Sequence, residues 1–420
     1  MKKLTTLLIV LLLMVSLAAC GGKTTEDDAD IVTVVPEGTE ITFWHAMNGA
    51  QEEALTKLTE DFMAANKNIK VVLQNQGSYN DLSQKFTAAL QSPSSLPTLT
   101  QAYPNMVANA AEEDFLLDFG PYITHSEIGM KDFDGIVEGF REGAKINGVQ
   151  YGMPFNKSTE VLFYNKTMLD SLNIEVPTTF EELAAAAKEV STKMPGVVGA
   201  GFDSLNNYYA TGLANEKIYI TEDLDVTSDE SKAVFQYYLD GIKGGYFRIA
   251  GTDKYLSGPF GSQILAMNVG STAGESHVKK AADGKFEYGV ALRPESVNIQ
   301  QGTDLFVFDN ATAEQKTAAF EYVKYLVSHE AQVYWAVQTG YIPVRQSAIE
   351  DKAYTESGSM IAPLVSDALK SLYTVPASSK ANQVYNESRN VMEKVLSDVN
   401  IDLNAELETF KAEVARIWAE

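Results

Sequence analysis

Hydrophobic residues follow two alternating patterns from residue 41 onward. Short apolar runs at 41–44, 71–73 and 160–164 predict strands, because runs of this length bounded by polar residues are typical of buried β-structure. Residues 51–66 and 81–91 place apolar side chains at every third or fourth position, which predicts helices with one apolar face. Strands that alternate with helices predict an α/β fold with crossover helices.

The alternation continues through the second half of the chain. Residues 180–194 predict a helix that begins at Thr178 or Thr179, because a hydroxyl side chain there can cap the first turn. Residues 313–328 and 387–418 predict further helices, and no internal repeat is present. Further strands are predicted at 264–267, 288–292 and 305–308.

The N-terminal segment differs from the rest of the chain. Lys2 and Lys3 precede an apolar run at 7–17, which two alanines and Cys20 follow. A positive start, a short apolar run and small residues before a cleavage point are typical of a signal peptide. The run is shorter than the roughly 20 apolar residues that a spanning helix needs. We therefore expect residues 1–19 to be a signal peptide.

The segment from Leu17 to Cys20 resembles the bacterial lipobox, in which the cysteine is acylated. Cys20 is the only cysteine of the chain, so it cannot form an internal disulfide. We expect it to be the lipid attachment site, with acyl chains that hold the protein at the outer face of the cell membrane. The polar and acidic residues 20–40 predict the lipidated N-terminus and a flexible tether.

Composition and charge limit the classes of partner. Hydrophobic residues make up 45% and charged residues 21% of the chain, which is typical of a globular protein. The net charge of −23 disfavours binding to nucleic acid and to anionic lipid, so no nucleic-acid partner is expected. An anionic small ligand is still compatible, because donors in a pocket act locally. We expect a monomer that meets the membrane through its anchor.

Enzyme signatures are missing from the sequence. The four histidines, His45, His125, His277 and His329, do not have a metal-ligand spacing. No Gly-x-Ser-x-Gly motif is present either. We expect no catalytic residue, no metal and no cofactor. Carboxylate pairs are abundant in so acidic a chain, which leaves a cell-surface glycosidase as an alternative of another class.

Several segments, taken together in order and spacing, point to one family. They lie at 43–47, 154–156, 161–166, 260–262, 266–267 and 339–343. They resemble the extracytoplasmic solute-binding proteins that serve ABC importers. Within that family they are most similar to binders of glycerol 3-phosphate and its diesters, and more distantly to maltose-type sugar binders. The resemblance implies a type II periplasmic-binding-protein-like fold with two discontinuous α/β lobes, a multi-strand hinge and the ligand between the lobes.

The resemblance also implies where the lobes divide. The first lobe would comprise 41–154 and 304–340, and the second 155–303 and 341–420. The crossings are expected near 154–158, 302–305 and 340–344. Closure of the lobes around the ligand would be recognised by the transmembrane subunits of an ABC permease, and the protein itself would perform no chemistry.

One candidate site follows from the residues themselves. The strand predicted at 264–267 is followed by Ser271 and Thr272, and a helix is predicted to begin near Gly274. Ligands bind beyond the carboxyl ends of strands in α/β sheets, and helix N-termini favour anions. Ser271 is thus a candidate anion ligand, although a serine in this position is also a common helix cap.

The resemblance adds ligand-binding candidates. Six residues match ligand-contacting positions of the glycerol-phosphate binders: Tyr79, Ser158, Ser271, Gly302, Tyr341 and Arg389. Arginine offers a planar fork of donors for phosphate oxygens, and glycine lets the backbone approach a ligand closely. Additional candidate contacts are Trp44, His45, Phe202 and Asp304.

Two departures from the pattern leave the ligand open. Pro104 follows Gln101-Ala102-Tyr103 where the glycerol 3-phosphate binders have an acidic residue, and the stretch around Phe202 replaces a pair of tryptophans. The ligand is therefore predicted to be glycerol 3-phosphate or a glycerophosphodiester. The alternative is a neutral oligosaccharide, stacked on aromatic rings such as Trp44, Phe202, Tyr208 and Tyr209.

Overall fold

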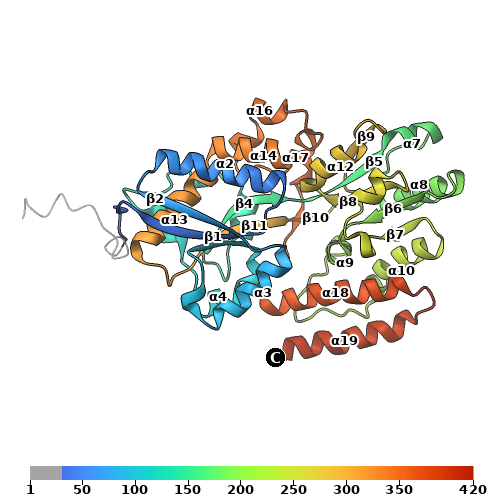
Figure 1. Ribbon diagram of the computed structural model, residues 1–420. Helices are drawn as coiled ribbons and strands as arrows, with labels where there is room; N and C mark the ends of the chain where they lie inside the picture. The colour runs from blue at the N-terminus through green and yellow to red at the C-terminus, as the bar shows by residue number, and fades with distance from the viewer. Residues whose placement is uncertain (1–30, 420) are drawn as a thin grey trace, which may run out of the picture.

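The computed structural model describes residues 31–419, which form two α/β lobes side by side (Figure 1). The predicted signal peptide and the lipid attachment site Cys20 lie outside the described residues. Within residues 31–419, no helix combines the length and the apolar character that crossing a membrane requires.

The first lobe is built on a five-stranded sheet. Its order is β2 (Ile69–Asn75), β1 (Thr39–His45), β3 (Leu99–Ala102), β11 (Gln301–Val307) and β4 (Gly152–Ser158). Strand β1 is parallel to β2 and β3, whereas β11 is antiparallel to β3 and β4. The late strand β11 therefore completes a sheet that the first hundred residues begin.

Helices cover both faces of the first sheet (Figure 1). They are α2 (Ala50–Ala65), α3 (Tyr79–Leu90), α4 (Ala108–Glu112), α13 (Ala313–Leu326) and α14 (His329–Thr339). Phe43 and Phe62 belong to a large core cluster on one face, and Phe86 and Phe306 to a smaller cluster. Ser78 caps α3 in a capping box with Asp81, which fixes where the helix begins.

The second lobe contains another five-stranded sheet. Its order is β7 (Phe247–Ile249), β6 (Val198–Phe202), β8 (Leu265–Ser271), β5 (Glu160–Asn165) and β9 (Tyr288–Leu292). Strand β6 is parallel to β7 and β8, and β5 is antiparallel to β8 and β9. The carboxyl ends of β6, β7 and β8 therefore lie at the same edge.

Five longer helices pack in the second lobe. They are α8 (Phe180–Lys193), α9 (Leu205–Asn215), α10 (Asp229–Lys243), α18 (Ser379–Ser397) and α19 (Leu403–Ala419). Helix α8 begins after Thr179, whose side chain accepts a hydrogen bond from Glu182 N, as the sequence predicts. Helices α18 and α19 lie together beneath the second lobe in Figure 1. The shorter helices are α5 (Phe119–Thr124), α6 (Glu138–Gly143), α7 (Lys166–Leu172), α11 (Ser257–Gly261), α12 (Glu275–Ala282), α15 (Gln346–Ile349), α16 (Lys352–Thr355) and α17 (Val365–Ala368).

Two crossings between the lobes lie close to the predicted positions. Strand β4 leads through Thr159 into β5, and β10 (Asn298–Ile299) leads back into β11. A short strand, β12 (Leu372–Tyr373), pairs in parallel with β10. The hinge is therefore a narrow bundle of strands whose backbone hydrogen bonds join both lobes.

The third crossing differs from the prediction at 340–344. Ile342 N donates to Lys157 O at 2.7 Å, so the chain touches the hinge there. It does not yet leave the first lobe, because α15 and α16 pack against α14. It reaches the second lobe only after α16, where Ser359 Oγ donates to Glu275 of α12 at 2.6 Å. The assignment of all residues from 341 to the second lobe is therefore corrected.

The prediction that residues 20–40 form a flexible tether is wrong for residues 31–35, which lie on the first lobe. Ile31 and Val35 pack against the first-lobe core. Thr317 Oγ1 donates to Val32 O at 2.5 Å, and Asn68 Nδ2 donates to Val35 O at 3.0 Å. Apolar side chains and these two hydrogen bonds thus fix the segment before β1 on the body.

Candidate functional site

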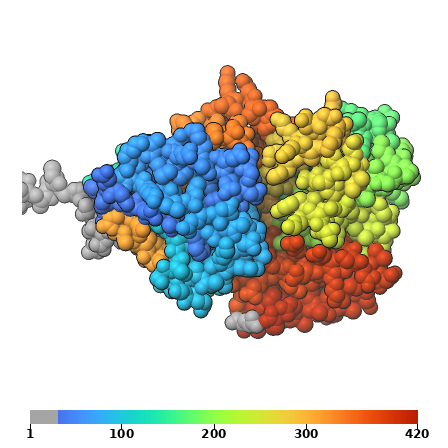
Figure 2. All heavy atoms as spheres, in the orientation of Figure 1, coloured from blue at the N-terminus to red at the C-terminus, as the bar shows by residue number. Residues whose placement is uncertain are grey.

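A cavity of about 540 Å³ lies between the two lobes. The lobes meet along a seam that is visible on the surface (Figure 2). Residues of both lobes and of the hinge line it, so its shape depends on how the lobes are arranged. Polar lining residues include Tyr79, Asn80, Ser83, Tyr103, Lys157, Ser204, Asn206, Asn207, Gln301, Asn382, Tyr385 and Arg389.

A cluster of tyrosines forms the first-lobe side of the cavity. The Tyr79 hydroxyl lies 3.3 Å from that of Tyr341 and accepts a hydrogen bond from Asn156 Nδ2 at 3.2 Å. The rings of Tyr79 and Tyr103 meet edge to face with centroids 5.8 Å apart. Tyr341 in turn stacks on Trp335 at 5.6 Å. Burial raises the pKa of Tyr341 to about 12, so its phenol stays protonated at neutral pH.

Gly302 lies on the hinge side of the cavity. Its φ is +86°, and a Cβ atom would lie only 1.8 Å from Asn156 O. No other residue fits this position without a backbone shift. The backbone of Gly302 also interacts with the Tyr103 hydroxyl. The missing side chain therefore allows β11 to approach β4 and the tyrosine cluster closely.

A buried ion pair lies beneath the cavity. Lys157 Nζ is 2.5 Å from Asp304 Oδ1, and the two side chains are 1% and 0% exposed. Burial raises the pKa of Asp304, and the charge of Lys157 opposes that rise. Lys157 lines the cavity but Asp304 does not. Asp304, predicted as a ligand contact, instead holds the lysine, because its own carboxylate is covered.

Helix α18 supplies the second-lobe side. The Tyr385 hydroxyl donates to Asn207 Oδ1, and Asn207 Nδ2 donates to Glu160 Oε1 at 2.9 Å. Arg389 is exposed and lines the cavity one helical turn further on. Among residues 31–419, the structure gives its guanidinium no hydrogen bond or ion pair. Its donors are therefore available to a ligand.

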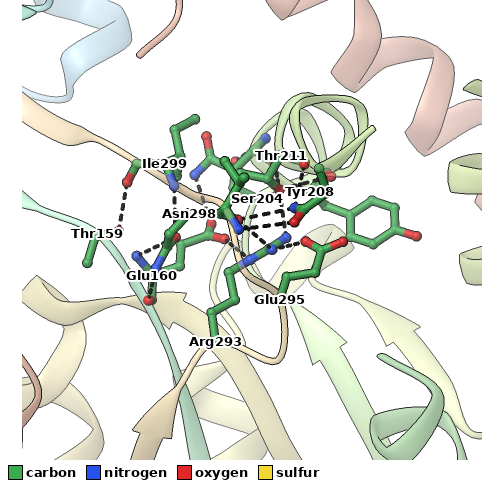
Figure 3. A network of polar contacts seen from close by, with 12 residues as sticks. Thr159, Glu160, Ser204, Tyr208, Thr211, Arg293, Glu295, Asn298 and Ile299 are labelled. Atoms are coloured by element: carbon green, nitrogen blue, oxygen red, sulfur yellow. Dashed lines mark hydrogen bonds and ion pairs between the residues drawn. The ribbon is translucent and has the colours of Figure 1, made fainter. Parts of the chain in front are cut away.

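A polar network holds these second-lobe groups in place (Figure 3). Arg293 Nε donates to Glu160 Oε2 at 3.2 Å, and Arg293 also contacts Glu295 and Thr211. Burial raises the pKa of Glu160, while the Arg293 charge lowers it. The network orients Asn207, and through it the Tyr385 hydroxyl at the cavity.

The charge of the cavity lining is opposite to that of the chain. Lys157 and Arg389 are its two cationic side chains, and none of the described residues that line it is an aspartate or glutamate. The whole chain carries a net charge of −23. The cavity is therefore a local region suited to an anion, because nearby donors act more strongly than distant surface charge.

A larger cavity of about 1420 Å³ opens on the second lobe. Six carboxylates line it, namely those of Glu181, Glu216, Asp229, Glu230, Glu295 and Asp367. The described residues before Pro177, which include β1 to β4 of the first lobe, contribute no side chain to this cavity. The interlobe cavity differs from it, because first-lobe residues such as Tyr79 and Tyr103 line it and phenolic, amide and cationic groups converge there.

The six principal candidates fall into two groups. Tyr79, Gly302 and Arg389 line the interlobe cavity, and Tyr341 lies behind Tyr79. Ser158 and Ser271 do not line it. Ser158 is 3% exposed at the end of β4.

Ser271 acts as a cap, which is one of the two roles that the sequence allowed for it. Its Oγ accepts a hydrogen bond from Ala273 N at 3.3 Å, at the start of a 3₁₀ turn that spans residues 272–274. Helix α12 begins directly after this turn, as predicted near Gly274. The cap stabilises this strand-to-helix connection.

The additional candidates lie away from the cavity lining. Trp44 is half-buried on β1, where its Nε1 donates to Gln74 at 2.7 Å. His45 is 2% exposed, and burial lowers its pKa. Phe202 lies in an aromatic core with Tyr208, and Tyr209 is also buried. The prediction that these rings stack on a sugar is corrected, because the core covers Phe202, Tyr208 and Tyr209.

Sequence reasoning missed several residues of the lining. Tyr103 follows β3 and Ser204 follows β6, so the rule for carboxyl ends of strands could have selected them. Asn207 and Tyr385 lie within helices and have no comparable signal. Lys157 also lines the cavity, from a position on β4 that buries its side chain.

One titratable group next to the cavity predicts a pH effect. Asp203 Oδ1 accepts a hydrogen bond from Leu256 N at 2.6 Å, and loss of water raises the pKa of Asp203 to about 6. Unfolded aspartate has a pKa of about 3.9.

Between roughly pH 4 and 6, folded Asp203 therefore keeps a proton that the unfolded chain has released. The folded state binds more protons than the unfolded state in this window, so the contribution of Asp203 to the free energy of unfolding falls as the pH rises. We expect Asp203→Asn to flatten this part of the profile in urea unfolding from pH 4 to 7; an unchanged slope would contradict the assignment.

Relatives with similar sequences are glycerol 3-phosphate binders by name. The sn-glycerol-3-phosphate-binding periplasmic protein UgpB of Rhizobium meliloti is 27% identical over 348 residues, which cover 74% of this chain and 77% of the relative. UgpB of Escherichia coli is 26% identical over 352 residues, with 77% of each chain covered.

Solved structures of similar proteins confirm the fold class. UgpB of Mycobacterium tuberculosis, in complex with glycerophosphocholine, has a TM-score of 0.78 at 20% identity and covers 90% of this chain and 98% of its own. The GacH receptor of Streptomyces glaucescens, studied with acarbose, has a TM-score of 0.77 at 21% identity, with 90% and 98% covered. Maltose-bound MalE3 of T. maritima has a TM-score of 0.78 at 19% identity, with 90% and 100% covered.

A family model matches most of the chain. The model describes a bacterial extracellular solute-binding protein and matches residues 57–362. That range includes the whole second sheet, every strand of the first sheet except β1, and the first-lobe side of the cavity. The chain therefore belongs to the family of bacterial extracellular solute-binding proteins.

Proposed function

We propose that this chain is the lipid-anchored substrate-binding protein of an ABC importer, and that it captures glycerol 3-phosphate or a glycerophosphodiester between its lobes. The observation that carries the ligand assignment is the charge of the cleft. Arg389 makes no hydrogen bond or ion pair within residues 31–419, and the described lining residues include no carboxylate. The other cation of the lining, Lys157, is already paired with Asp304 beneath the cavity. Such a surface attracts a phosphate, and no carboxylate of the described lining would repel it.

The two sides of the cleft divide the recognition. The planar guanidinium of Arg389 suits phosphate oxygens, which accept two parallel hydrogen bonds from such a fork. The phenols of Tyr79 and Tyr103, with the amides of Asn206 and Asn207, suit glycerol hydroxyls because each can donate or accept. Closure of the lobes then excludes water and strengthens these contacts. Likeness to UgpB proteins supports the same ligand class.

Location and partners follow from the same proposal. Cys20 would be acylated and would keep the body at the outer face of the membrane, close to the permease. The closed pair of lobes would then present one combined surface to the transmembrane subunits. The chain would bind and release its ligand without changing it, since a glycosidase needs two carboxylates at the bond it cleaves. The described lining contains none.

A neutral oligosaccharide is the second candidate ligand. Three tyrosines, Tyr79, Tyr103 and Tyr385, line the cavity and could pack against sugar rings. The acarbose and maltose complexes of structurally similar proteins favour the same idea. In this case Arg389 would have no anionic partner.

A thermal-shift panel tests the proposal. The purified body is heated with glycerol 3-phosphate, glycerophosphocholine, inorganic phosphate, maltose or maltotriose. A ligand that binds only the folded state raises the melting temperature. We expect stabilisation by a phosphorylated glycerol compound and none by the sugars. Stabilisation by sugars alone would overturn the ligand assignment, and turnover of any compound would contradict a pure binding function.

A further inference from the structure

The loop after β7 reaches the edge of the second sheet that faces the first lobe. Strands β6, β7 and β8 are parallel, so their carboxyl ends share one edge. Ser204, just beyond β6, lines the cleft. The loop at 250–256 follows β7 and therefore begins at the same edge, where ligands of α/β sheets bind.

This loop holds one aromatic side chain in the open. Tyr255 is 68% exposed, whereas its neighbour Leu256 is fully buried. An exposed aromatic ring at the edge of a cleft is a large contact surface with few rotatable bonds. Tyr255 does not line the cavity in this arrangement of the lobes. Its ring is therefore free to gain contacts when the arrangement changes.

The backbone around Tyr255 is fixed on both sides. Lys254 has a φ of +65°, a conformation that residues other than glycine rarely adopt. Tyr255 N donates to Asp253 O at 2.8 Å, and Asp253 also pairs with Arg248. On the other side, Leu256 N donates to Asp203. Local strain of this kind persists only where surrounding contacts enforce it, and here it presents the ring outward.

Two first-lobe tyrosines interact electrostatically with this ring. Burial is the main cause that raises the pKa values of Tyr103 and Tyr341, and the Tyr255 phenol adds to both. Such an effect acts through space and becomes weaker with distance. It agrees with the place that the strand order gives this loop, at the edge of the second sheet beside the cleft.

We propose that Tyr255 is a ligand-covering residue, whose ring folds over the carbon skeleton of the bound solute as the lobes close and slows its release. The inference rests on the proposed binding function, but it does not depend on the phosphate contact of Arg389. An aromatic contact that forms only in the closed state acts mainly on dissociation, because the encounter occurs with the open cleft. Tyr255→Phe keeps the ring, and Tyr255→Ala removes it.

The test measures association and dissociation rates by stopped-flow fluorescence, with glycerol 3-phosphate, glycerophosphocholine and maltose as probes. We expect Tyr255→Ala to raise the dissociation rate of the bound probe about tenfold and to leave association within about twofold. Tyr255→Phe should stay within about twofold of the unmodified protein, since the ring provides the contact. Tyr246→Ala is the matched control, because Tyr246 precedes the opposite end of β7.

The outcomes separate this inference from the proposed function. An unmodified protein that binds none of the probes would overturn both. Normal binding with an unchanged dissociation rate in Tyr255→Ala would overturn the role of Tyr255 alone. Equal effects in Tyr255→Ala and Tyr246→Ala, or a lowered melting temperature of the free Tyr255→Ala protein that accounts for the loss, would also overturn it.

Discussion

Replacing Arg389 with alanine is expected to weaken binding of glycerol 3-phosphate by about 10- to 150-fold. A hydrogen bond to a charged group contributes roughly 1.5–3 kcal/mol, and each 1.4 kcal/mol is a factor of ten in affinity. The guanidinium is exposed and makes no hydrogen bond or ion pair within residues 31–419, so its loss should leave the folded protein intact. Isothermal titration calorimetry gives the affinity, and thermal unfolding of the free protein checks the stability.

Two further variants make this result specific. Arg389→Lys keeps the charge but loses the planar fork, so we expect an affinity between those of the unmodified protein and Arg389→Ala. Lys394→Ala removes another cation of α18, which pairs with Glu406 outside the cavity lining, and should leave binding unchanged. An unaltered affinity in Arg389→Ala would remove this residue from the site and favour the neutral sugar.

Replacing Asp304 with alanine is expected to lower the free energy of unfolding by about 3–5 kcal/mol. The change leaves the ammonium of Lys157 buried without its partner, since that side chain is 1% exposed. Removal of one member of a buried ion pair is costly because the remaining charge has lost water as well as its counter-ion. Urea unfolding followed by circular dichroism measures the difference.

The double variant Lys157→Met with Asp304→Leu is the informative comparison. It replaces both charges by apolar groups of similar size, so much of the lost stability should return. Asp170→Ala breaks the exposed pair with Lys166 and should cost less than about 1 kcal/mol. If Asp304→Ala costs no more than this surface variant, the pair does not stabilise the hinge. Phosphate affinity of the double variant then reports how much Lys157 adds to binding.

The fold was predictable because hydrophobic spacing is a local property. The run at 41–44 lies in β1. The helix expected to begin at Thr178 or Thr179 has Thr179 as its cap, because an apolar face and a capping residue are enough to define such a helix. The third crossing was misplaced because Ile342 touches the hinge without leaving the first lobe. The segment at 31–38 was included in the predicted tether, because four apolar residues without a helix or strand period do not reveal that a core lies beside them.

The site was predictable only in part, and for a different reason. Tyr79, Gly302 and Arg389 were selected through resemblance and do line the cleft. Lys157 was missed and Asp304 was misjudged, because antiparallel pairing of β4 and β11 buries both, and pairing across about 150 residues leaves no local pattern. Contacts of Tyr385 depend on how α18 packs against α9, which the order of residues does not specify.

The contribution of α18 has a consequence for how the protein is made. The cleft draws on residues from Tyr79 to Arg389, so a growing chain has no complete site until nearly all of it has been synthesised. A chain exported from its N-terminus would assemble α18 onto the second lobe only after most of its length has crossed the membrane. Such a chain would reach the outside without ligand, and it would carry no solute out of the cytosol.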